Sequence, residues 1–361
     1  MAQQRALIAM SGGVDSSVAA YLMQAQGYDC QGVTMRLYYG SHGRFHTCCA
    51  QEDIEDAMEV AFQLGIPYDV IDFTADFRTQ VMDKFCRIYE AGGTPNPCID
   101  CNRYLKFDRL YQAARERGAE YVVTGHYARI WRDPQSGRYL LGKGLDPSKD
   151  QSYVLYTMTQ EQLAHTQFPL GGLEKSRVRE IAAAQGLVNA KKHDSQDICF
   201  IPDGDYGAFL ERYTGRHYPP GDFLSQDGQV LGQHRGAVRY TLGQRKGLGL
   251  ALGTPCYVCG KDMAANTVTV GPEEALYRRS LLAEDLNWIA FDTLPGSLRV
   301  KAMTRYRQPE QWATASMTQE GLLRLDFDRP QRAMTPGQAV VLYDGGLVLG
   351  GGTICRTLDE T

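Results

Sequence analysis

The chain has 361 residues, and its 38 basic and 42 acidic side chains leave a formal net charge of −4. That charge excludes a uniformly basic nucleic-acid-binding protein, so a polyanionic partner must bind to local basic patches. The first apolar run is too short for a signal peptide, and no window approaches the roughly 18 apolar residues of a membrane span. We therefore expect a cytoplasmic protein of two or three domains, with ten reduced, catalytic or metal-binding cysteines rather than a disulfide framework.

Short apolar runs alternate with amphipathic stretches in the N-terminal half of the chain. Strands are expected at residues 6–10, 30–36, 68–73 and 121–124, and helices at 14–26, 52–64, 75–91 and 104–117. This alternation predicts an α/β fold with a doubly wound parallel sheet covered on both faces. Ligands of such sheets bind at the carboxyl ends of the strands, so the residues that follow these strands should line the site.

Directly after the first expected strand lies the most informative motif of the chain. Residues 11–17 read Ser-Gly-Gly-Val-Asp-Ser-Ser and lead into a helix. Two glycines at the change from strand to helix let backbone N–H groups surround an anion, and the helix dipole and serine hydroxyls favour phosphate there. The Gly-Lys-Ser/Thr ending of a Walker A loop is missing. The motif resembles the pyrophosphate-binding loop of ATP-pyrophosphatases, which cleave ATP between its α and β phosphates and leave AMP on a substrate.

The alternative for this motif is an ordinary strand-to-helix turn with incidental glycines. An acid and two serines beside the glycines favour the nucleotide instead. We predict that ATP binds to this loop and to residues that follow neighbouring strands. The predicted contacts are Ala9, Met10, Ser11, Gly12, Gly13, Val14, Asp15, Ser16, Ser17, Met35 and Gly125.

A second informative stretch spans residues 93–102, where two prolines precede Cys98 and Cys101. The prolines make a stiff loop that cannot continue the preceding helix. A Cys-x-x-Cys pair alone is a zinc half-site, a redox pair or two ordinary buried thiols, and spacing does not decide between them. A third cysteine, Cys199, lies where polar residues give way to an apolar run.

The C-terminal part of the chain has a different character, with glycines, prolines and short β-rich runs. Strands are expected at residues 237–242, 255–258, 267–270, 299–303, 322–327 and 339–343. Turn signals separate these runs, which predicts a small β-rich middle domain and a C-terminal β-barrel. The expected domains are residues 1–209, 210–277 and 278–361.

Two basic patches lie in these β-rich regions. Residues 232–261 contain Arg245 and Lys246 and no acid, and a second patch contains Arg305 and Tyr306. Basic side chains bind a phosphate backbone, and a tyrosine stacks on a base. Runs of this kind are more often solvated faces, so the patches alone do not establish RNA binding.

Taken together, the motifs resemble those of the tRNA-specific 2-thiouridylase family, whose members replace O2 of the wobble uridine in tRNA by sulfur. The resemblance runs over essentially the whole chain. The motifs that carry it lie at residues 11–17, 94–102, 124–127, 149–153, 194–201, 240–249, 304–307 and 335–338. The fold that this resemblance implies is an adenine nucleotide alpha hydrolase-like domain followed by the two β-rich domains.

The resemblance implies a two-step reaction. ATP first adenylates O2 of the uridine and releases pyrophosphate, with Mg²⁺ spreading the phosphate charge and Asp15 as the partner of the ion. Sulfur then attacks C2, and AMP leaves. In the family's usual account Cys199 carries this sulfur as a persulfide, and Cys101 releases it by forming a disulfide with Cys199. The implied catalytic residues are Asp15, Cys101 and Cys199.

The resemblance also implies that Asn96, Pro97 and Cys98 touch a target base that has left its stack. The implied partners are the anticodon region of tRNA and a cysteine desulfurase or sulfur carrier as sulfur donor. The other expected tRNA contacts are His126, Lys149, Asp150, Gln151, Arg245, Lys246, Arg305, Tyr306 and Gln338. Alternatively, residues 149–151 form a loop that fixes the ATP-binding domain, and His126 forms a hydrogen bond with a backbone carbonyl.

Cys98 departs from the family pattern, because many relatives have aspartate at this position. Cys98, Cys101 and Cys199 together are enough to hold three irons of a 4Fe–4S cluster and leave the fourth iron open for hydrosulfide. Spacing cannot identify the metal, so a persulfide and a cluster both remain open as the sulfur carrier.

The residues also leave two other functions open. A ligase with the same loop would adenylate a small carboxylate or amide and would stay active when Cys199 is replaced by alanine. A non-catalytic RNA-binding protein with a relic nucleotide site would release no AMP and pyrophosphate in response to tRNA. Of the three functions, the residues favour the tRNA sulfurtransferase.

Overall fold

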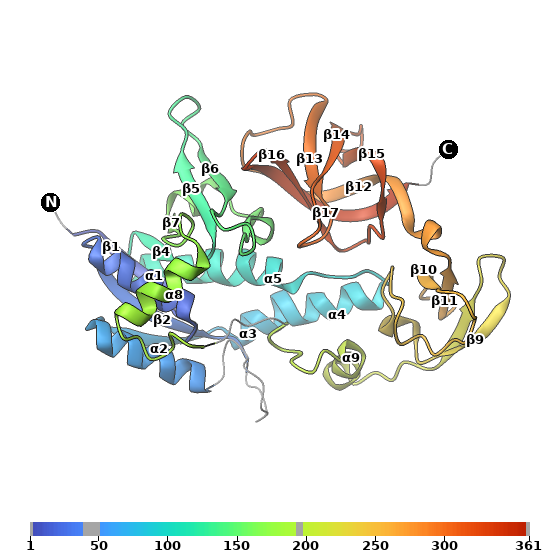
Figure 1. The fold of residues 1–361 in the computed structure, drawn as a ribbon, viewed down its shortest axis with the longest axis horizontal. Helices are drawn as coiled ribbons and strands as arrows, with labels where there is room; N and C mark the ends of the chain where they lie inside the picture. Colours follow the sequence, from blue (N-terminus) through green and yellow to red (C-terminus); the bar gives the residue numbers. More distant parts are fainter. Residues whose placement is uncertain (1–2, 39–50, 193–197, 359–361) are drawn as a thin grey trace. The chain divides into compact units, whose positions relative to one another are not determined.

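The computed structural model describes residues 3–38, 51–192 and 198–358 (Figure 1). The chain divides into two compact units. The first consists of Met1–Met82, Pro97–Gly204 and Gly346–Leu349, and the second of Asp83–Asn96, Asp205–Gly345 and Gly350–Thr361. Among the helices of the described ranges, none is both long enough and apolar enough to cross a membrane. The expected domain limits at residues 209 and 277 stay a prediction.

The first unit is built on a five-stranded parallel sheet, as the sequence predicts. Its strand order is β3-β2-β1-β4-β7, and all neighbours are parallel. The strands are β1 (Arg5–Ala9), β2 (Asp29–Arg36), β3 (Tyr68–Asp72), β4 (Tyr121–Val123) and β7 (Thr166–Gln167). The order reverses between β1 and β4, and open α/β sheets bind ligands at such a switch point.

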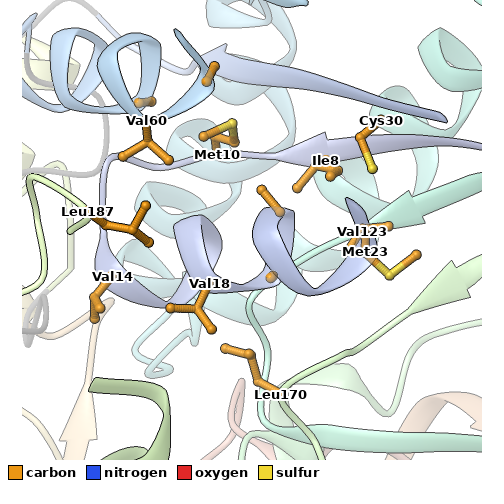
Figure 2. Packing of buried hydrophobic residues seen from close by; sticks show 14 of the residues in the cluster. Ile8, Met10, Val14, Val18, Met23, Cys30, Val60, Val123, Leu170 and Leu187 are labelled. Carbon is orange, nitrogen blue, oxygen red and sulfur yellow. The ribbon is translucent and has the colours of Figure 1, made fainter. Parts of the chain in front are cut away.

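The core of this unit joins the sheet to its helices (Figure 2). Ile8 of β1, Val14 and Val18 of α1 (Val14–Ala25) and Val60 of α2 (Gln51–Leu64) are buried. Val14 and Val18 are one helical turn apart and therefore share a face. Burial of each such side chain contributes about 1.5–3 kcal/mol, and this packing fixes the start of α1 relative to the sheet.

Two expected helices each contain a π-helical segment. The expected helix 75–91 is α3 (Thr74–Phe77), a π-helical segment η1 (Arg78–Met82) and α4 (Asp83–Glu90). The expected helix 104–117 begins earlier, as α5 (Pro97–Asp100), a π-helical segment η2 (Cys101–Arg109) and α6 (Leu110–Glu116). Proline is well suited to a first helical position because it has no N–H to lose, so the helix starts at Pro97.

The remaining elements of the first unit include an antiparallel hairpin of β5 (Ala128–Arg132) and β6 (Tyr139–Lys143), in which β6 also pairs with Leu347 and Val348. Two of its short helices lie between β6 and β7, and the third follows β7. They are η3 (Ser152–Leu155), α7 (Gln160–Ala164) and α8 (Lys175–Ala184).

The second unit contains a four-stranded sheet of order β10-β11-β8-β9. Its strands are β8 (Gly221–Leu224), β9 (Val230–His234), β10 (Tyr257–Asp262) and β11 (Thr267–Gly271), and α9 (Tyr206–Thr214) precedes them. The expected strand 237–242 is wrong: Ala237–Arg239 form a 3₁₀ turn, η4. Gly236 enters this turn with φ +100°, and the apolar residues Ala237 and Tyr240 are buried beside Phe223 instead of alternating along a strand.

The C-terminal barrel of this unit confirms the predicted β-barrel. Six strands follow one another in the order β12-β15-β14-β13-β16-β17, and β17 pairs back with β12 to close the ring. The strands are β12 (Tyr277–Trp288), β13 (Leu298–Met303), β14 (Gln311–Met317), β15 (Leu323–Arg332), β16 (Ala339–Asp344) and β17 (Leu347–Leu358), after the turn η5 (Glu273–Leu276). Closure removes the sheet edges that otherwise promote aggregation.

Candidate active site

The loop after β1 has the backbone of an anion site. Gly12 has φ +69°, and a Cβ on it would lie 2.2 Å from the carbonyl oxygen of Asp53, so only glycine fits. Gly13 starts α1 in an extended conformation, and no side chain in the described ranges caps the helix there. The first N–H groups of α1 therefore remain suited to an anionic ligand such as phosphate.

The hydroxyl groups of this loop stabilise its shape. The Ser16 hydroxyl accepts a hydrogen bond from the backbone N–H of Ser11 at 3.1 Å and donates to the carbonyl of Gly13 at 3.0 Å. The Ser17 hydroxyl donates to the same carbonyl at 3.1 Å. The predicted loop residues thus form one hydrogen-bonded turn at the carboxyl end of β1.

The segment after β4 packs directly on this turn. A Cβ on Gly125 would lie 2.8 Å from the backbone of both Asp15 and Ser16, so glycine is needed for this approach. Two residues later, the Tyr127 hydroxyl donates to Oδ1 of Asp15 at 2.7 Å. The structure therefore brings Gly125 to the loop as the sequence predicts, because β1 and β4 are neighbours.

Asp15 has a second partner that the sequence analysis missed. Nζ of Lys175, the first residue of α8, lies 2.7 Å from both Oδ1 and Oδ2 of Asp15. The lysine is only 8% exposed. Asn189 was missed as well; its amide donates to the Gly12 carbonyl at 3.0 Å and to the Ser17 hydroxyl at 2.8 Å.

Two of the three missed residues, Lys175 and Tyr127, left a signal in the sequence. Lys175 stands at the start of a helix, where a positive charge opposes the helix dipole, and such a lysine needs an anionic partner. Tyr127 belongs to the Thr-Gly-His-Tyr motif but was not assigned a role. Asn189 offers no signal in the sequence, because its position beside Gly12 arises only from the tertiary fold.

The surroundings of Asp15 do not fit the Mg²⁺ ion that the sequence predicts there. The carboxylate already accepts hydrogen bonds from an ammonium and a hydroxyl. A divalent ion about 4 Å from that ammonium would be repelled by roughly 8 kcal/mol at an effective dielectric constant of 20. In this arrangement Asp15 is the counter-ion of Lys175.

A separate ion pair supports the loop from behind. Lys192 contacts Asp53 at 2.6 Å and also Asp56 of α2. Burial lowers the pKa of Lys192, but hydrogen bonds to the two carboxylates and their negative charges outweigh burial and leave the pKa above its usual value. Because the Asp53 backbone packs against Gly12, this pair helps to hold the loop in place.

The predicted sulfur-handling cysteines belong to the first unit. Cys98 is exposed, Cys101 and Cys199 are half-buried, and all three are reduced thiols. Around Cys199 the packing is aromatic: its carbonyl accepts a hydrogen bond from the Tyr38 hydroxyl, and Phe200 packs edge-to-face on Phe77 at 5.6 Å. These contacts hold the Cys199 segment against the C-terminal end of β2 and against α3.

The three cysteines do not assemble into a metal site in this structure. Within the described ranges, no group of three or more His, Cys, Asp or Glu side chains is arranged to hold a metal ion. The structure therefore gives no support for the 4Fe–4S cluster, which stays a prediction. Asn102, next to Cys101, is buried and donates to the carbonyl of Val154 at 3.1 Å, which anchors the cysteine loop.

Several predicted tRNA contacts lie inside the protein. His126 is buried between Phe107 and Phe168, and its Nδ1 lies 2.7 Å from the Thr124 hydroxyl. Burial, with a smaller effect of the Lys106 charge, holds the pKa of His126 well below its usual value. The imidazole is therefore neutral at pH 7 and supports the segment that follows β4.

Residues 149–151 have contacts that agree with the alternative reading of a fixing loop. Asp150 accepts hydrogen bonds from the backbone N–H of Gly144 at 2.9 Å and the hydroxyl of Ser152 at 2.8 Å. Gln151 exchanges two hydrogen bonds with the backbone of Tyr127, at 2.9 and 3.0 Å. Lys149 is half-buried. Gln151 thereby orients the tyrosine that contacts Asp15.

The remaining predicted tRNA residues lie in the second unit, except Pro97 and Cys98, which belong to the first. Gln338 is buried and donates to the carbonyls of Thr94 at 2.8 Å and Pro95 at 3.3 Å, so it holds the loop that leads to Asn96. Exposed or half-buried basic and aromatic side chains suit RNA better. They are Arg245 and Lys246, which are exposed, and Arg305 and Tyr306, which are half-buried.

Comparison with known proteins finds matches to families of protein domains along the chain. Three family models match: the tRNA methyl transferase HUP domain at residues 4–203, the tRNA methyl transferase PRC-barrel domain at 207–272 and the aminomethyltransferase beta-barrel domain at 278–354. Among solved structures, a 4-thiouridine synthetase–RNA complex with bound ATP has 18% identity and a TM-score of 0.34, over 59% of this chain and 50% of that one. That similarity is too low to carry an argument.

The similarity to curated proteins is much higher. The tRNA-specific 2-thiouridylase MnmA of Heliobacterium modesticaldum is 51% identical over 99% of this chain and 94% of its own length. The enzyme of the same name from Moorella thermoacetica is 52% identical over 96% of this chain and 98% of its own length. With this identity over nearly its full length, the chain belongs to the tRNA-specific 2-thiouridylase family.

Proposed function

We propose that the protein is an ATP-dependent tRNA-uridine 2-sulfurtransferase that thiolates the wobble uridine in the cytoplasm. The observation that carries this function is a pyrophosphatase-type loop at the switch point of the sheet, in a chain about half identical to named 2-thiouridylases. The family models are described as methyl transferase domains, but methyl transfer has no use for a loop that binds the pyrophosphate of ATP.

In the first step the loop and the start of α1 bind the phosphates of ATP. Backbone N–H groups around Gly12 and Gly13 face the phosphates, and the segment after β4 lines the nucleotide together with Met35. O2 of the uridine attacks the α-phosphorus, the bond to the bridging oxygen breaks, and pyrophosphate leaves. The uridine then carries AMP as a good leaving group on C2.

In the second step sulfur replaces this oxygen. The terminal sulfur of a Cys199 persulfide attacks C2, and AMP leaves with O2. The Cys101 thiolate then attacks Sγ of Cys199, which releases the thiouridine and leaves a Cys101–Cys199 disulfide. A dithiol reductant must restore both thiols before a cysteine desulfurase or a sulfur carrier loads Cys199 again.

The tRNA binds with its anticodon region, through local basic groups rather than through the overall charge. Exposed Arg245 and Lys246 contact the phosphate backbone, and Tyr306 stacks on a base beside Arg305. Asn96, Pro97 and Cys98 contact the flipped target base.

A reconstituted reaction tests this function. Purified protein, unmodified tRNA, ATP, Mg²⁺ and a cysteine desulfurase with cysteine should yield 2-thiouridine, seen as retardation in a mercury gel. AMP release should depend on tRNA. A Cys199→Ala variant should still release pyrophosphate on tRNA and leave the uridine adenylated, but it should form no thiouridine and release no AMP by sulfur transfer. AMP release on a small carboxylate without tRNA, unaffected by this variant, would instead identify a ligase.

The same reaction distinguishes the two sulfur carriers. Iron-free protein should form thiouridine if the persulfide suffices. If product appears only after anaerobic reconstitution of a cluster, Cys98, Cys101 and Cys199 are cluster ligands and the persulfide step is wrong.

A further inference from the structure

Lys175 is a buried cation at a position where a helix gains nothing from it. It begins α8, so its charge opposes the dipole of its own helix, and lysine is almost never buried without a strong partner. Its backbone N–H donates to Oδ2 of Asp146 at 3.1 Å, which fixes the start of α8 independently of the side chain. The position of the ammonium therefore needs a reason other than helix stability.

The ammonium reaches directly to the predicted phosphate loop. Nζ contacts both oxygens of Asp15 at 2.7 Å and lies 5.7 Å from the centre of the Tyr127 ring, whose hydroxyl donates to the same carboxylate. Asp15 thus receives hydrogen bonds on both oxygens and is fixed from two sides. A carboxylate fixed in this way holds the ammonium at the start of α1.

The loop beside Lys175 also has polar groups that the described residues leave without a hydrogen-bond partner. Oδ1 of Asn189 is buried and meets no hydrogen-bond donor in the described ranges, although the amide of the same residue is bonded to Gly12 and Ser17. Together with the uncapped start of α1, this polar atom marks a site that the protein alone does not complete.

We propose that Lys175 supplies the positive charge that stabilises the departing pyrophosphate, and that Asp15 positions this ammonium instead of binding a metal ion. The proposal rests on the proposed adenylation of uridine. When the bond between the α-phosphorus and the bridging oxygen breaks, negative charge grows on the pyrophosphate. An ammonium has three N–H donors, so Lys175 can keep its hydrogen bonds to Asp15 and donate another to a phosphate oxygen.

Two substitutions, tested singly and together, separate these roles. Lys175→Met removes the charge and keeps most of the stem, Asp15→Asn removes the counter-ion, and the double variant restores neutrality. Single-turnover formation of AMP on unmodified tRNA should fall by about 100-fold in Lys175→Met. It should fall by a smaller factor in Asp15→Asn. The double variant should be no slower than Lys175→Met, because Asp15 acts through Lys175.

The Mg²⁺ dependence provides the second readout. If Asp15 positions Lys175, the Mg²⁺ concentration for half-maximal rate in Asp15→Asn stays within about threefold of the wild-type value. ATP affinity measured in EDTA should fall in Lys175→Met, because the ammonium contacts the phosphates without a metal ion. Arg177→Met is the matched control, since Arg177 lies on the same helix, is exposed and forms an ion pair with Glu180.

Each remaining outcome overturns the proposal. A rate within threefold of wild type in Lys175→Met would show that its charge is not used. A tenfold higher Mg²⁺ requirement in Asp15→Asn would identify Asp15 as a metal ligand. If the fall in rate in the double variant equals the product of the falls in the two single variants, Asp15 does not act through Lys175. Thermal unfolding of all variants detects misfolding. The double variant is the least exposed to this risk, because it leaves no unpaired charge in the site. If the wild-type protein releases no AMP on tRNA, the proposed function fails first, and the two failures are thus distinguished.

Discussion

His126 shows how burial changes what a histidine does. The sequence places it in a motif expected to contact tRNA, whereas the structure buries it between two phenylalanine rings. A neutral imidazole bonded to the Thr124 hydroxyl supports the end of β4 without carrying charge. Its importance in this structure is therefore positional, because Gly125 and Tyr127 on either side of it contact Asp15.

The lowered pKa of His126 makes stability depend on pH. Above the unfolded-state pKa of about 6.5 the imidazole is neutral in both the folded and the unfolded state, so His126 causes no loss of stability there. As the pH falls below this value, the unfolded state binds a proton that the folded state refuses, so stability falls by at most about 1.4 kcal/mol per pH unit. Urea unfolding between pH 7.5 and 5.5 measures this slope.

A His126→Gln variant is the control for that slope. Glutamine can still bond to the Thr124 hydroxyl but does not titrate. If the variant shows the same pH dependence as the wild-type protein, another group is responsible.

Gly125 is a second residue with a large expected effect, because an added Cβ atom would displace the loop after β1. In Gly125→Ala the new methyl would lie 2.8 Å from the backbone of Asp15 and Ser16, so the loop must shift. We expect a loss of about 1–3 kcal/mol in stability and, because misplacement of about 1 Å is costly, a roughly 100-fold loss of AMP formation. Calorimetry and a single-turnover assay measure the two effects.

Gly172 offers the matched substitution. A Cβ there meets nothing within 4 Å, so Gly172→Ala should leave both quantities almost unchanged. Equal effects of the two substitutions would contradict the steric argument.

At the scale of elements, the sequence predicted the parallel sheet and the extent of most helices well, but not the π-helical segments within two of them. Apolar runs bounded by turn signals identified β1 to β4 within one or two residues. The expected helix 75–91 has suitable periodicity throughout, and nothing local marks the π-helical segment Arg78–Met82. Such a segment arises from tertiary packing, which a periodicity does not contain.

The candidate site could be predicted to a similar extent. The loop residues and Gly125 follow from motif and strand order, and the structure brings them together. Lys175, Tyr127 and Asn189 join them through the fold alone, across more than 100 residues of sequence. Gln338 and Asp150 were predicted to contact tRNA, and in the structure their polar groups bond to backbone atoms, which sequence cannot distinguish from ligand contacts.

The aromatic packing beside Cys199 leads to a prediction about an element rather than a single contact. Tyr38→Phe removes the hydrogen bond to the Cys199 carbonyl and keeps the ring stacked on Phe77. We expect a loss of about 0.5–1.5 kcal/mol in stability. Sulfur transfer, and with it the release of AMP, should slow severalfold while the release of pyrophosphate stays the same, because the loop after β1 is untouched.

The rates of thiouridine formation and pyrophosphate release in a single turnover measure this separation. Tyr28→Phe is a suitable control, since Tyr28 lies at the start of β2 and packs on Tyr121, away from Cys199. An equal fall of both products in Tyr38→Phe would show that the aromatic contacts serve the whole unit.

At the scale of the molecule, an acidic chain must bind a polyanion through few groups. Replacing Arg245 and Lys246 together by glutamine should weaken tRNA binding and reduce the slope of log affinity against log salt by roughly 1.5–2. The rate of AMP formation at saturating tRNA should not change. Filter binding at several salt concentrations measures the slope.

An arginine outside the predicted patches provides the comparison. Arg324 on β15 is paired with Asp326 at 2.8 Å, so Arg324→Gln should leave the slope unchanged. If both sets of substitutions reduce the slope of log affinity against log salt equally, tRNA binding depends only on the overall charge of the protein.

The hydrogen bonds from Asn189 to Gly12 and Ser17 also have a consequence for synthesis on the ribosome. They join residues 177 and 172 positions apart, so the nucleotide site stays incomplete until most of the first unit has been translated. At about 5–20 residues per second, the loop waits roughly 10–35 s for its partner. A nascent chain therefore has no finished ATP site during this interval, and the nucleotide cannot guide the earliest stages of its folding.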